Sequence, residues 1–182
     1  MLLGEVTRAP ERRIADLPML SGDERAALLA PVRSVPARPA SSLSLQSRFE
    51  AQAARTPAAT AIVCDGEHIT YAELNERANR VAHYLRSHGV GANSLVALYL
   101  ERTRDMAVAI LGVTKAGAGY LPLEPIYPAD RVAFMLGDAQ PAVVLTQQSL
   151  RDGLPASSAH IVAIDSDWPE FAAQPAGNLA IA

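Results

Sequence analysis

Cysteine, lysine and aromatic residues are all scarce in this chain of 182 residues. Its one cysteine, Cys64, excludes an internal disulfide and any metal site built from several cysteines, because both need more than one thiol. The same scarcity is typical of a reducing compartment, so we expect a cytoplasmic protein. Aromatic side chains make up 5% of the residues, so alanine, leucine and valine must fill most of the core.

Long apolar runs and an excess of basic charge are missing as well. The longest apolar run, residues 95–100, is far too short to cross a bilayer, and Glu5 interrupts the amino terminus before a signal peptide can form. A formal net charge of -3, without a dense basic face, gives no support to a nucleic-acid or membrane partner. The 49% hydrophobic and 19% charged residues fit one globular domain with a short appendage.

The first part of the chain is predicted to form that appendage and a linker. Ser21 and Glu24 have the spacing of a capping box, which predicts a short helix that ends before Pro31. Residues 31–44 hold three prolines and four serines without hydrophobic periodicity, a composition typical of an extended linker. We therefore expect a domain boundary in this stretch.

A helix and a hairpin are predicted next. Apolar residues at steps of four indicate a helix over 45–55. Two short segments typical of strands, 61–64 and 68–71, flank the turn pair Asp65-Gly66, which indicates a hairpin.

The helix that follows the hairpin has clear signals at both ends. Thr70 and Glu73 form a second capping box, and Gly89 stands where a helix-ending glycine belongs. Two i,i+4 ion pairs are expected on its exposed side, Glu73–Arg77 and Glu76–Arg80.

Strands and helices alternate from residue 95 onward. The run 95–100 shows no polar alternation, which predicts a strand buried on both faces. Gly112, inside a predicted helix over 105–116, indicates the close approach of another backbone. Further strands are expected at 120–123, 142–146 and 160–165. The fold class is therefore α/β, with a partial doubly wound, mostly parallel sheet flanked by helices and preceded by the hairpin and a helical linker.

Gly117-Ala-Gly119 is similar to part of a dinucleotide fingerprint, but two features argue against that function. Pro122 stands where the third glycine belongs, and the glycines follow a helix instead of a strand. A helix cap and a tight turn explain them better. No phosphate-loop motif is present, and Lys115, in the last helical turn, is expected to complement the helix dipole.

The remaining reactive side chains also have structural explanations. The spacing of His83 and His88 places them on different sides of a helix, so a metal site is not predicted. Cys64 lies in an apolar strand and is expected to be a buried, inert thiol. Asp165 and Asp167, next to Trp168, are interpreted as helix caps.

Three motifs carry a resemblance to a known family. They are Ile69-Thr-Tyr-Ala-Glu-Leu-Asn-Glu-Arg-Ala-Asn79, Lys115-Ala-Gly-Ala-Gly-Tyr-Leu-Pro-Leu-Glu-Pro125 and Tyr127-Pro-Ala-Asp-Arg131. In this order and spacing they resemble the first core motifs of amino-acid adenylation domains in non-ribosomal peptide synthetases, part of the AMP-dependent synthetase and ligase superfamily. Glu124 departs from the aspartate usual in the family.

The resemblance implies an ATP-dependent ligase. Such a parent enzyme activates an amino acid with ATP and Mg²⁺ to an aminoacyl adenylate, and then loads it on the phosphopantetheine thiol of a carrier protein. Residues 14–25 are similar to the end of a condensation domain. On this basis residues 1–30 are a condensation-domain tail with a linker helix, 31–44 the Pro/Ser-rich linker, and 45–182 the amino-terminal part of an adenylation domain.

In the family, a phosphate-binding loop follows the segment that resembles Asn178-Leu-Ala, and this chain stops before such a loop. We therefore expect no catalytic, cofactor-binding or metal-binding residue and no adenylation activity in the isolated chain. The residues carried over are scaffold: Thr70 and Glu73 as cap, Gly117 and Gly119 as turn glycines, Tyr120 and Pro122 as packing.

Two alternatives stay open. One is part of a stand-alone acyl- or aryl-CoA ligase, which shares the superfamily fold but not the condensation-like front. The other is a non-catalytic module that binds a partner.

Overall fold

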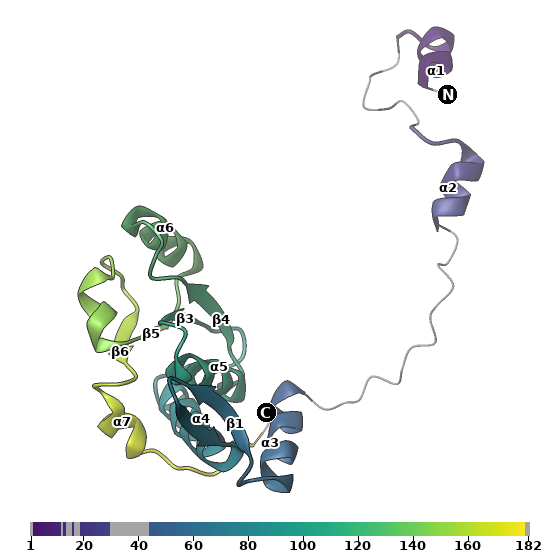
Figure 1. Ribbon diagram of the computed structural model, residues 1–182. Coiled ribbons are helices and arrows are strands. Elements are labelled where there is room, and N and C mark those ends of the chain that lie inside the picture. Colours follow the sequence, from purple (N-terminus) through teal and green to yellow (C-terminus); the bar gives the residue numbers. More distant parts are fainter. Residues whose placement is uncertain (1, 12, 14–15, 17–18, 30–43, 181–182) are drawn as a thin grey trace. The chain divides into compact units, whose positions relative to one another are not determined.

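The computed structural model describes residues 2–11, 13, 16, 19–29 and 44–180 (Figure 1). The chain divides into two compact units, Met1–Ser42 and Leu43–Ala182. The first unit carries helices α1 (Leu2–Arg8) and α2 (Gly22–Leu29). Nearly all of the predicted linker over 31–44 lies outside the described residues. No helix among the described residues has the length and apolar character needed to cross a membrane.

The predicted capping box at Ser21 is confirmed. The Ser21 hydroxyl oxygen accepts a hydrogen bond from the Glu24 backbone N–H at 3.1 Å, and the Glu24 carboxylate accepts one from the Ser21 backbone N–H at 2.8 Å. Each residue thus satisfies a backbone donor that the start of a helix leaves free.

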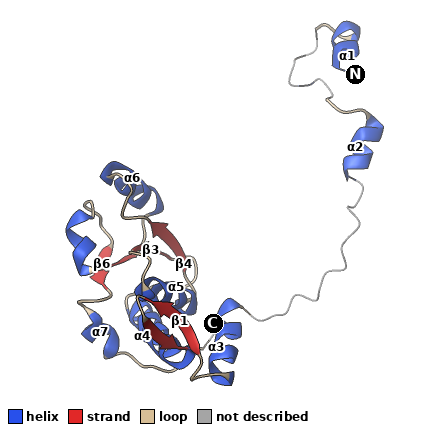
Figure 2. Cartoon of the chain, in the orientation of Figure 1, coloured by secondary structure: helices blue, strands red, loops and turns tan. Residues whose placement is uncertain are grey.

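The described part of the second unit contains six helical segments and six strands (Figure 2). Its helices are α3 (Leu45–Arg55), α4 (Tyr71–Ser87), α5 (Arg104–Ala116), α6 (Ala129–Ala139), the 3₁₀ helix η2 (Gln148–Gly153) and α7 (Trp168–Ala172). Its strands are β1 (Thr60–Cys64), β2 (Glu67–Thr70), β3 (Leu95–Tyr99), β4 (Gly119–Leu123), β5 (Val143–Thr146) and β6 (His160–Ala163).

These strands form two sheets. β1 and β2 pair as the predicted antiparallel hairpin, with Cys64 opposite Glu67 next to the turn. The other strands form a parallel sheet in the order β4-β3-β5-β6, with Val96 of β3 opposite Tyr120 on one side and Val143 on the other. The predicted α/β class with a mostly parallel sheet is confirmed.

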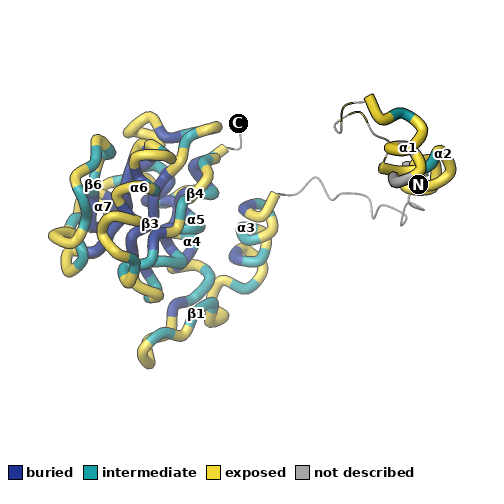
Figure 3. The backbone as a smooth tube through the Cα atoms, turned by 90° about the horizontal axis from the view of Figure 1, so that it is seen from above, coloured by how far each residue is buried: buried dark blue, intermediate teal, exposed yellow. Residues whose placement is uncertain are grey.

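Side chains of β3 alternate between two cores. Val96 and Leu98 lie in a core shared with α4 and α5, whereas Ala97 and Tyr99 lie in a core shared with α6. Successive side chains of a strand point to opposite faces, so a strand covered on both sides needs apolar residues at every position. This explains the unbroken apolar run, and Figure 3 shows the buried backbone gathered around β3.

Helix α4 packs tightly against α5 and is capped at both ends. A Cβ atom built on Gly112 would lie 2.5 Å from Cγ1 of Val81 and 3.3 Å from the backbone oxygen of Ala78, so the predicted close approach of another backbone is confirmed and the neighbour is α4. At the amino end of α4, Thr70 and Glu73 exchange the two hydrogen bonds of the predicted capping box. At its carboxyl end, Gly89 has a φ of 77°, which a glycine adopts without strain.

Candidate functional site

The carboxyl ends of β3 and β5 meet where the sheet reverses its order. The chain leaves β3 through α5 to reach β4 on one side, whereas β5 pairs with β3 on the other side. Open α/β sheets bind ligands at such switch points, outside the carboxyl ends of the strands. Here Oε1 of Gln147 accepts a hydrogen bond from the Glu101 backbone N–H at 2.9 Å, which joins the segments that follow the two strands.

A hollow of about 270 Å³ lies at this switch point. It is lined by Cys64, Asp65, Glu67, Thr103, Arg104, Asp105 and Gln147. Thr103 precedes α5, yet its hydroxyl makes no capping hydrogen bond, and its buried Oγ1 has no partner among the described residues. The hollow therefore combines the amino end of a helix with a hydroxyl that has no hydrogen-bond partner among the described residues. Three of its lining residues are acidic.

A larger cleft of about 740 Å³ lies between the hairpin, α4 and α7. Its lining residues are Glu67, His68, Ile69, Glu73, Glu76, Arg77, Arg80, Arg104, Trp168 and Ala172. Glu67 and Arg104 also line the smaller hollow, and they form an ion pair with each other. The two hollows are therefore neighbours that share this pair.

Arg77 occupies the centre of the charge network in the larger cleft. Its guanidinium lies 4.1 Å from the centroid of the Trp168 ring, a cation–π contact, and 3.7 Å from the Asp105 carboxylate. Burial lowers the pKa of Arg77, and the Asp105 charge opposes that shift. The predicted Glu73–Arg77 ion pair is wrong, because Glu73 is used in the capping box and Arg77 turns to Asp105. The predicted Glu76–Arg80 pair is confirmed at 2.9 Å.

These residues do not fit ATP and Mg²⁺. Each of the three arginines in the cleft already contacts a carboxylate: Arg77 with Asp105, Arg80 with Glu76 and Arg104 with Glu67. A triphosphate needs cations or backbone N–H groups that other anions do not occupy. Over the described part of the chain, no group of three or more His, Cys, Asp or Glu residues is arranged to hold a metal ion.

The scaffold residues carried over from the resemblance meet different outcomes. Gly117, at the end of α5, has a φ of 82° and serves as the predicted helix cap. Gly119 lies in β4 close to its neighbour, since a Cβ there would be 3.0 Å from Cδ2 of Leu95. The expected packing by Tyr120 and Pro122 is not observed: Tyr120 is 45% exposed and Pro122 is exposed too, because β4 is the edge strand.

Two predictions about charged or reactive side chains need correction. Lys115 does not simply complement the dipole of α5; its side chain is 1% exposed, and its ammonium pairs with the Glu50 carboxylate of α3. Cys64 is half-buried instead of buried, and its thiol lies 3.6 Å from Oδ2 of Asp65. The departure at Lys115 arises from a contact between α5 and α3 that helix periodicity does not reveal, whereas the contact of Cys64 is with the next residue in the chain.

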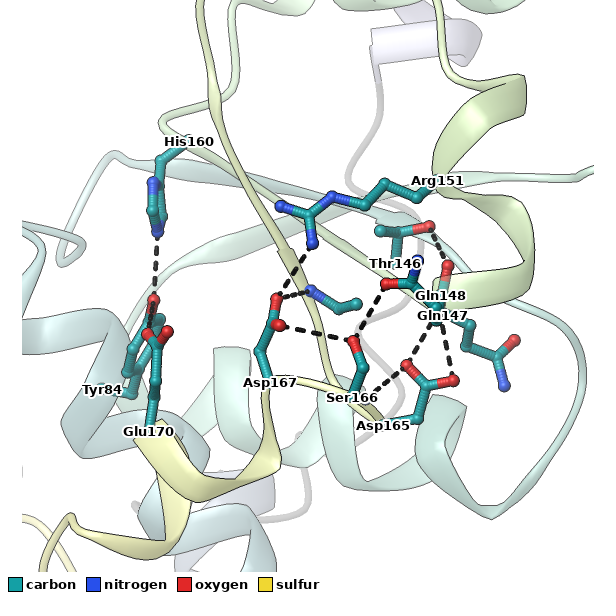
Figure 4. A network of polar contacts seen from close by, with 11 residues as sticks. Tyr84, Thr146, Gln147, Gln148, Arg151, His160, Asp165, Ser166, Asp167 and Glu170 are labelled. Atoms are coloured by element: carbon teal, nitrogen blue, oxygen red, sulfur yellow. Dashed lines mark hydrogen bonds and ion pairs between the residues drawn. The ribbon is translucent and has the colours of Figure 1, made fainter.

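The carboxylates after β6 do not cap α7, the helix that follows them (Figure 4). Asp165 accepts a hydrogen bond from the Gln148 backbone N–H at 2.9 Å, and Asp167 accepts one from the Ala163 backbone N–H at 2.9 Å. The Asp167 carboxylate makes no capping bond to α7. These two residues therefore fasten the start of η2 and the end of β6.

A second polar cluster in Figure 4 was not predicted from the sequence. The Tyr84 hydroxyl donates a hydrogen bond to Glu170 at 3.1 Å and lies 3.0 Å from Nε2 of His160. The His160 ring stacks on the His88 ring with centroids 4.9 Å apart. Burial and the hydrogen bond to Glu170 raise the pKa of Tyr84 to about 12. Because α4, β6 and α7 supply these residues, no single stretch of sequence signals the cluster.

Comparison with known proteins identifies this scaffold. Residues 49–179 match the AMP-binding enzyme family, and this stretch makes up more than half of the chain. The chain belongs to the AMP-binding enzyme family.

Within this family, the chain is similar to peptide synthetases. A linear gramicidin synthase protein of Brevibacillus parabrevis is 44% identical over 178 residues, which is 98% of this chain and 3% of that protein. The dimodular nonribosomal peptide synthase of Bacillus subtilis (strain 168) is 43% identical over 181 residues, which is 97% of this chain and 8% of that protein. The chain therefore spans only a small share of these relatives.

Solved structures give the same result for the fold. The AMPPNP-bound form of the nonribosomal peptide synthetase FmoA3 aligns with a TM-score of 0.76 at 33% identity, covering 100% of this chain and 20% of that one. The N-terminal subdomain of Klebsiella oxytoca NpsA aligns with a TM-score of 0.64 at 20% identity, over 76% of this chain and 34% of that one. The parallel sheet and its helices are therefore those of the amino-terminal lobe in such proteins.

Proposed function

We propose that residues 45–182 build the first part of the large lobe of an amino-acid adenylation domain in a nonribosomal peptide synthetase. The observation that carries the proposal is the 44% identity to a linear gramicidin synthase across nearly the whole chain. The lobe architecture shared with FmoA3 supports it. The role of these residues is structural, since they form the sheet, the helix caps and the buried ion pair on which the rest of the lobe is built.

The parent protein activates an amino acid with ATP and Mg²⁺, and releases pyrophosphate as the aminoacyl adenylate forms. It then transfers the acyl group to the phosphopantetheine thiol of a carrier-protein domain. Its partners are the remainder of the adenylation domain, a condensation domain and the carrier in the same assembly line. Residues 1–30 are the tail of that condensation domain with its linker helix, and residues 31–44 form the linker to the adenylation domain.

Carrier loading by the longer protein tests this proposal. A protein that extends this chain through a complete adenylation domain is incubated with ATP, Mg²⁺, a panel of amino acids and a phosphopantetheinylated carrier domain. We expect one amino acid, or a few similar ones, to appear as a thioester on the carrier by intact-mass spectrometry. An acyl or aryl thioester of free coenzyme A, with no loading of the carrier, would instead assign the chain to a stand-alone ligase. No adenylate with any acid would leave only the partner-binding alternative.

A further inference from the structure

The segment after α7, residues 173–178, has a turn at 173 and bends at 174 and 177, contacts α4 and pairs with no strand of either sheet; we call it the strap. Side chains of α4 contact its backbone carbonyl oxygens. The contacts are Asn79 Nδ2 to Ala176 O at 2.7 Å, Arg80 Nη1 to Gln174 O at 3.1 Å and His83 Nε2 to Gly177 O at 3.0 Å. Because carbonyl oxygens are common to all residues, these contacts hold the backbone of the strap but do not fix which of its residues sits at which position.

Asn178, at the end of the strap, is recognised by its side chain. Its Oδ1 atom lies 3.0 Å from Nδ2 of Asn75, 3.0 Å from Nδ2 of Asn79 and 3.4 Å from Nζ of Lys115. Three donors from two helices thus converge on one oxygen. An amide oxygen at this point of the strap fixes its register in a way that the carbonyl contacts do not.

Lys115 is the charged member of this group, and it is held in place from the other side. Its side chain is 1% exposed and its ammonium pairs with Glu50 of α3, whose side chain is 18% exposed. Burial lowers the pKa of Lys115, and the Glu50 carboxylate opposes that shift. A buried ammonium is tolerated only when its hydrogen bonds are satisfied, so both Glu50 and Asn178 are partners that it needs.

We propose that Lys115 is a positioning residue, which anchors the strap on α4 through Asn178 and is itself oriented by Glu50. The buried ion pair joins α3 to α5, and the oxygen of Asn178 joins both to the strap. The consequence for a complete adenylation domain rests on the proposed function: there Lys115 sets the direction in which the chain continues beyond Asn178. The anchoring itself is a property of the chain described here and does not depend on that function.

Backbone ¹⁵N relaxation of the 182-residue chain tests the anchor. In the unaltered protein we expect order parameters near 0.85 for Gly177, Asn178 and Leu179, as in rigid backbone. In Asn178→Ala, which removes the side-chain oxygen but no apolar core residue, they should fall below about 0.6, while those of β3 and β5 stay unchanged. Lys115→Met should produce the same loss. If Lys115→Met does not fold, Asn178→Ala alone decides.

Two control variants separate anchoring from general destabilisation. Arg86→Met removes an exposed cation of α4 whose guanidinium lies next to Gly91 and Gly117 and makes no hydrogen bond to the strap among the described residues, so the strap should stay rigid. Asn178→Asp keeps an oxygen in front of the three donors and should also preserve the order. Strap order parameters that remain near 0.85 in Asn178→Ala, or that fall equally in Arg86→Met, would overturn the proposal. Failure of the carrier-loading assay would leave this result untouched.

Discussion

Gly112 and Gly137 are both helical glycines, but their surroundings differ. A Cβ at Gly112 would meet Val81 at 2.5 Å, whereas nothing lies within 4 Å of the same atom at Gly137. We expect Gly112→Ala to lower the free energy of unfolding by about 1–3 kcal/mol through overpacking. Gly137→Ala, its matched control, should raise that free energy by about 0.5–1 kcal/mol, because alanine costs less entropy than glycine in a helix. Urea titrations of both variants measure the difference, and equal effects would contradict the close contact of α4 and α5.

Tyr84 gives a prediction about pH. Its pKa is raised to about 12 in the folded chain, because its hydroxyl is buried and donates to Glu170, whereas an unfolded tyrosine titrates near 10. Below pH 10 the hydroxyl is neutral in both states and its contribution to stability is fully present. As the pH rises from 10 to 12 the unfolded state ionises first, and that contribution is lost.

The variant Tyr84→Phe cannot ionise, so its free energy of unfolding should fall less between pH 10 and 12 than that of the unaltered protein. Urea unfolding at several pH values in this window measures the two slopes. Parallel slopes would show that the Tyr84 hydroxyl is not buried against Glu170 in solution.

At the scale of elements, a threonine directly precedes both α4 and α5, but the two threonines make different contacts. Thr70 caps α4 in a complete capping box, whereas Thr103 makes no side-chain capping bond to α5. We expect Thr70→Ala to cost about 1 kcal/mol of stability, the usual value for a lost cap. Thr103→Ala removes a hydroxyl whose buried oxygen has no partner among the residues described, so it should be neutral or slightly stabilising. Thermal unfolding of the pair is the measurement, and a larger loss at Thr103 would refute this assignment.

The elements themselves were readable from the sequence because their causes are local. The spacing of apolar residues and the capping residues determine α4. The unbroken apolar run of β3 reflects a strand that is covered on both faces. Where a prediction was wrong, a contact between distant segments decided the outcome. Lys115 pairs with Glu50, 65 positions away in the chain, and Arg77 pairs with Asp105 instead of Glu73. Neither partner stands at the i,i+4 spacing on which a helix-based prediction relies.

The candidate site was less predictable than the fold for the same reason. The switch point follows from the strand order β4-β3-β5-β6, and strand order is a property of the whole sheet. The strap and the Tyr84 cluster likewise join α4 to residues 76 to 103 positions further along the chain. A single sequence contains the residues of such contacts but no signal for their pairing.

For the whole molecule, we propose that these residues form scaffold for a ligase lobe and that other residues of the longer protein bind the nucleotide. The three arginines of the large cleft are each paired with a carboxylate, so we do not expect them to bind a triphosphate. The claim concerns activity, so it is tested by comparing this chain with the longer protein under the same conditions.

The most direct measurement is amino-acid-dependent exchange of labelled pyrophosphate into ATP by the purified 182-residue chain. The complete adenylation domain serves as the positive control in the same assay. We predict that exchange by the chain stays at the level of a reaction without enzyme for every amino acid tested, while the complete domain responds to its substrate. Exchange by the chain that depends on one amino acid and saturates with ATP would contradict the account.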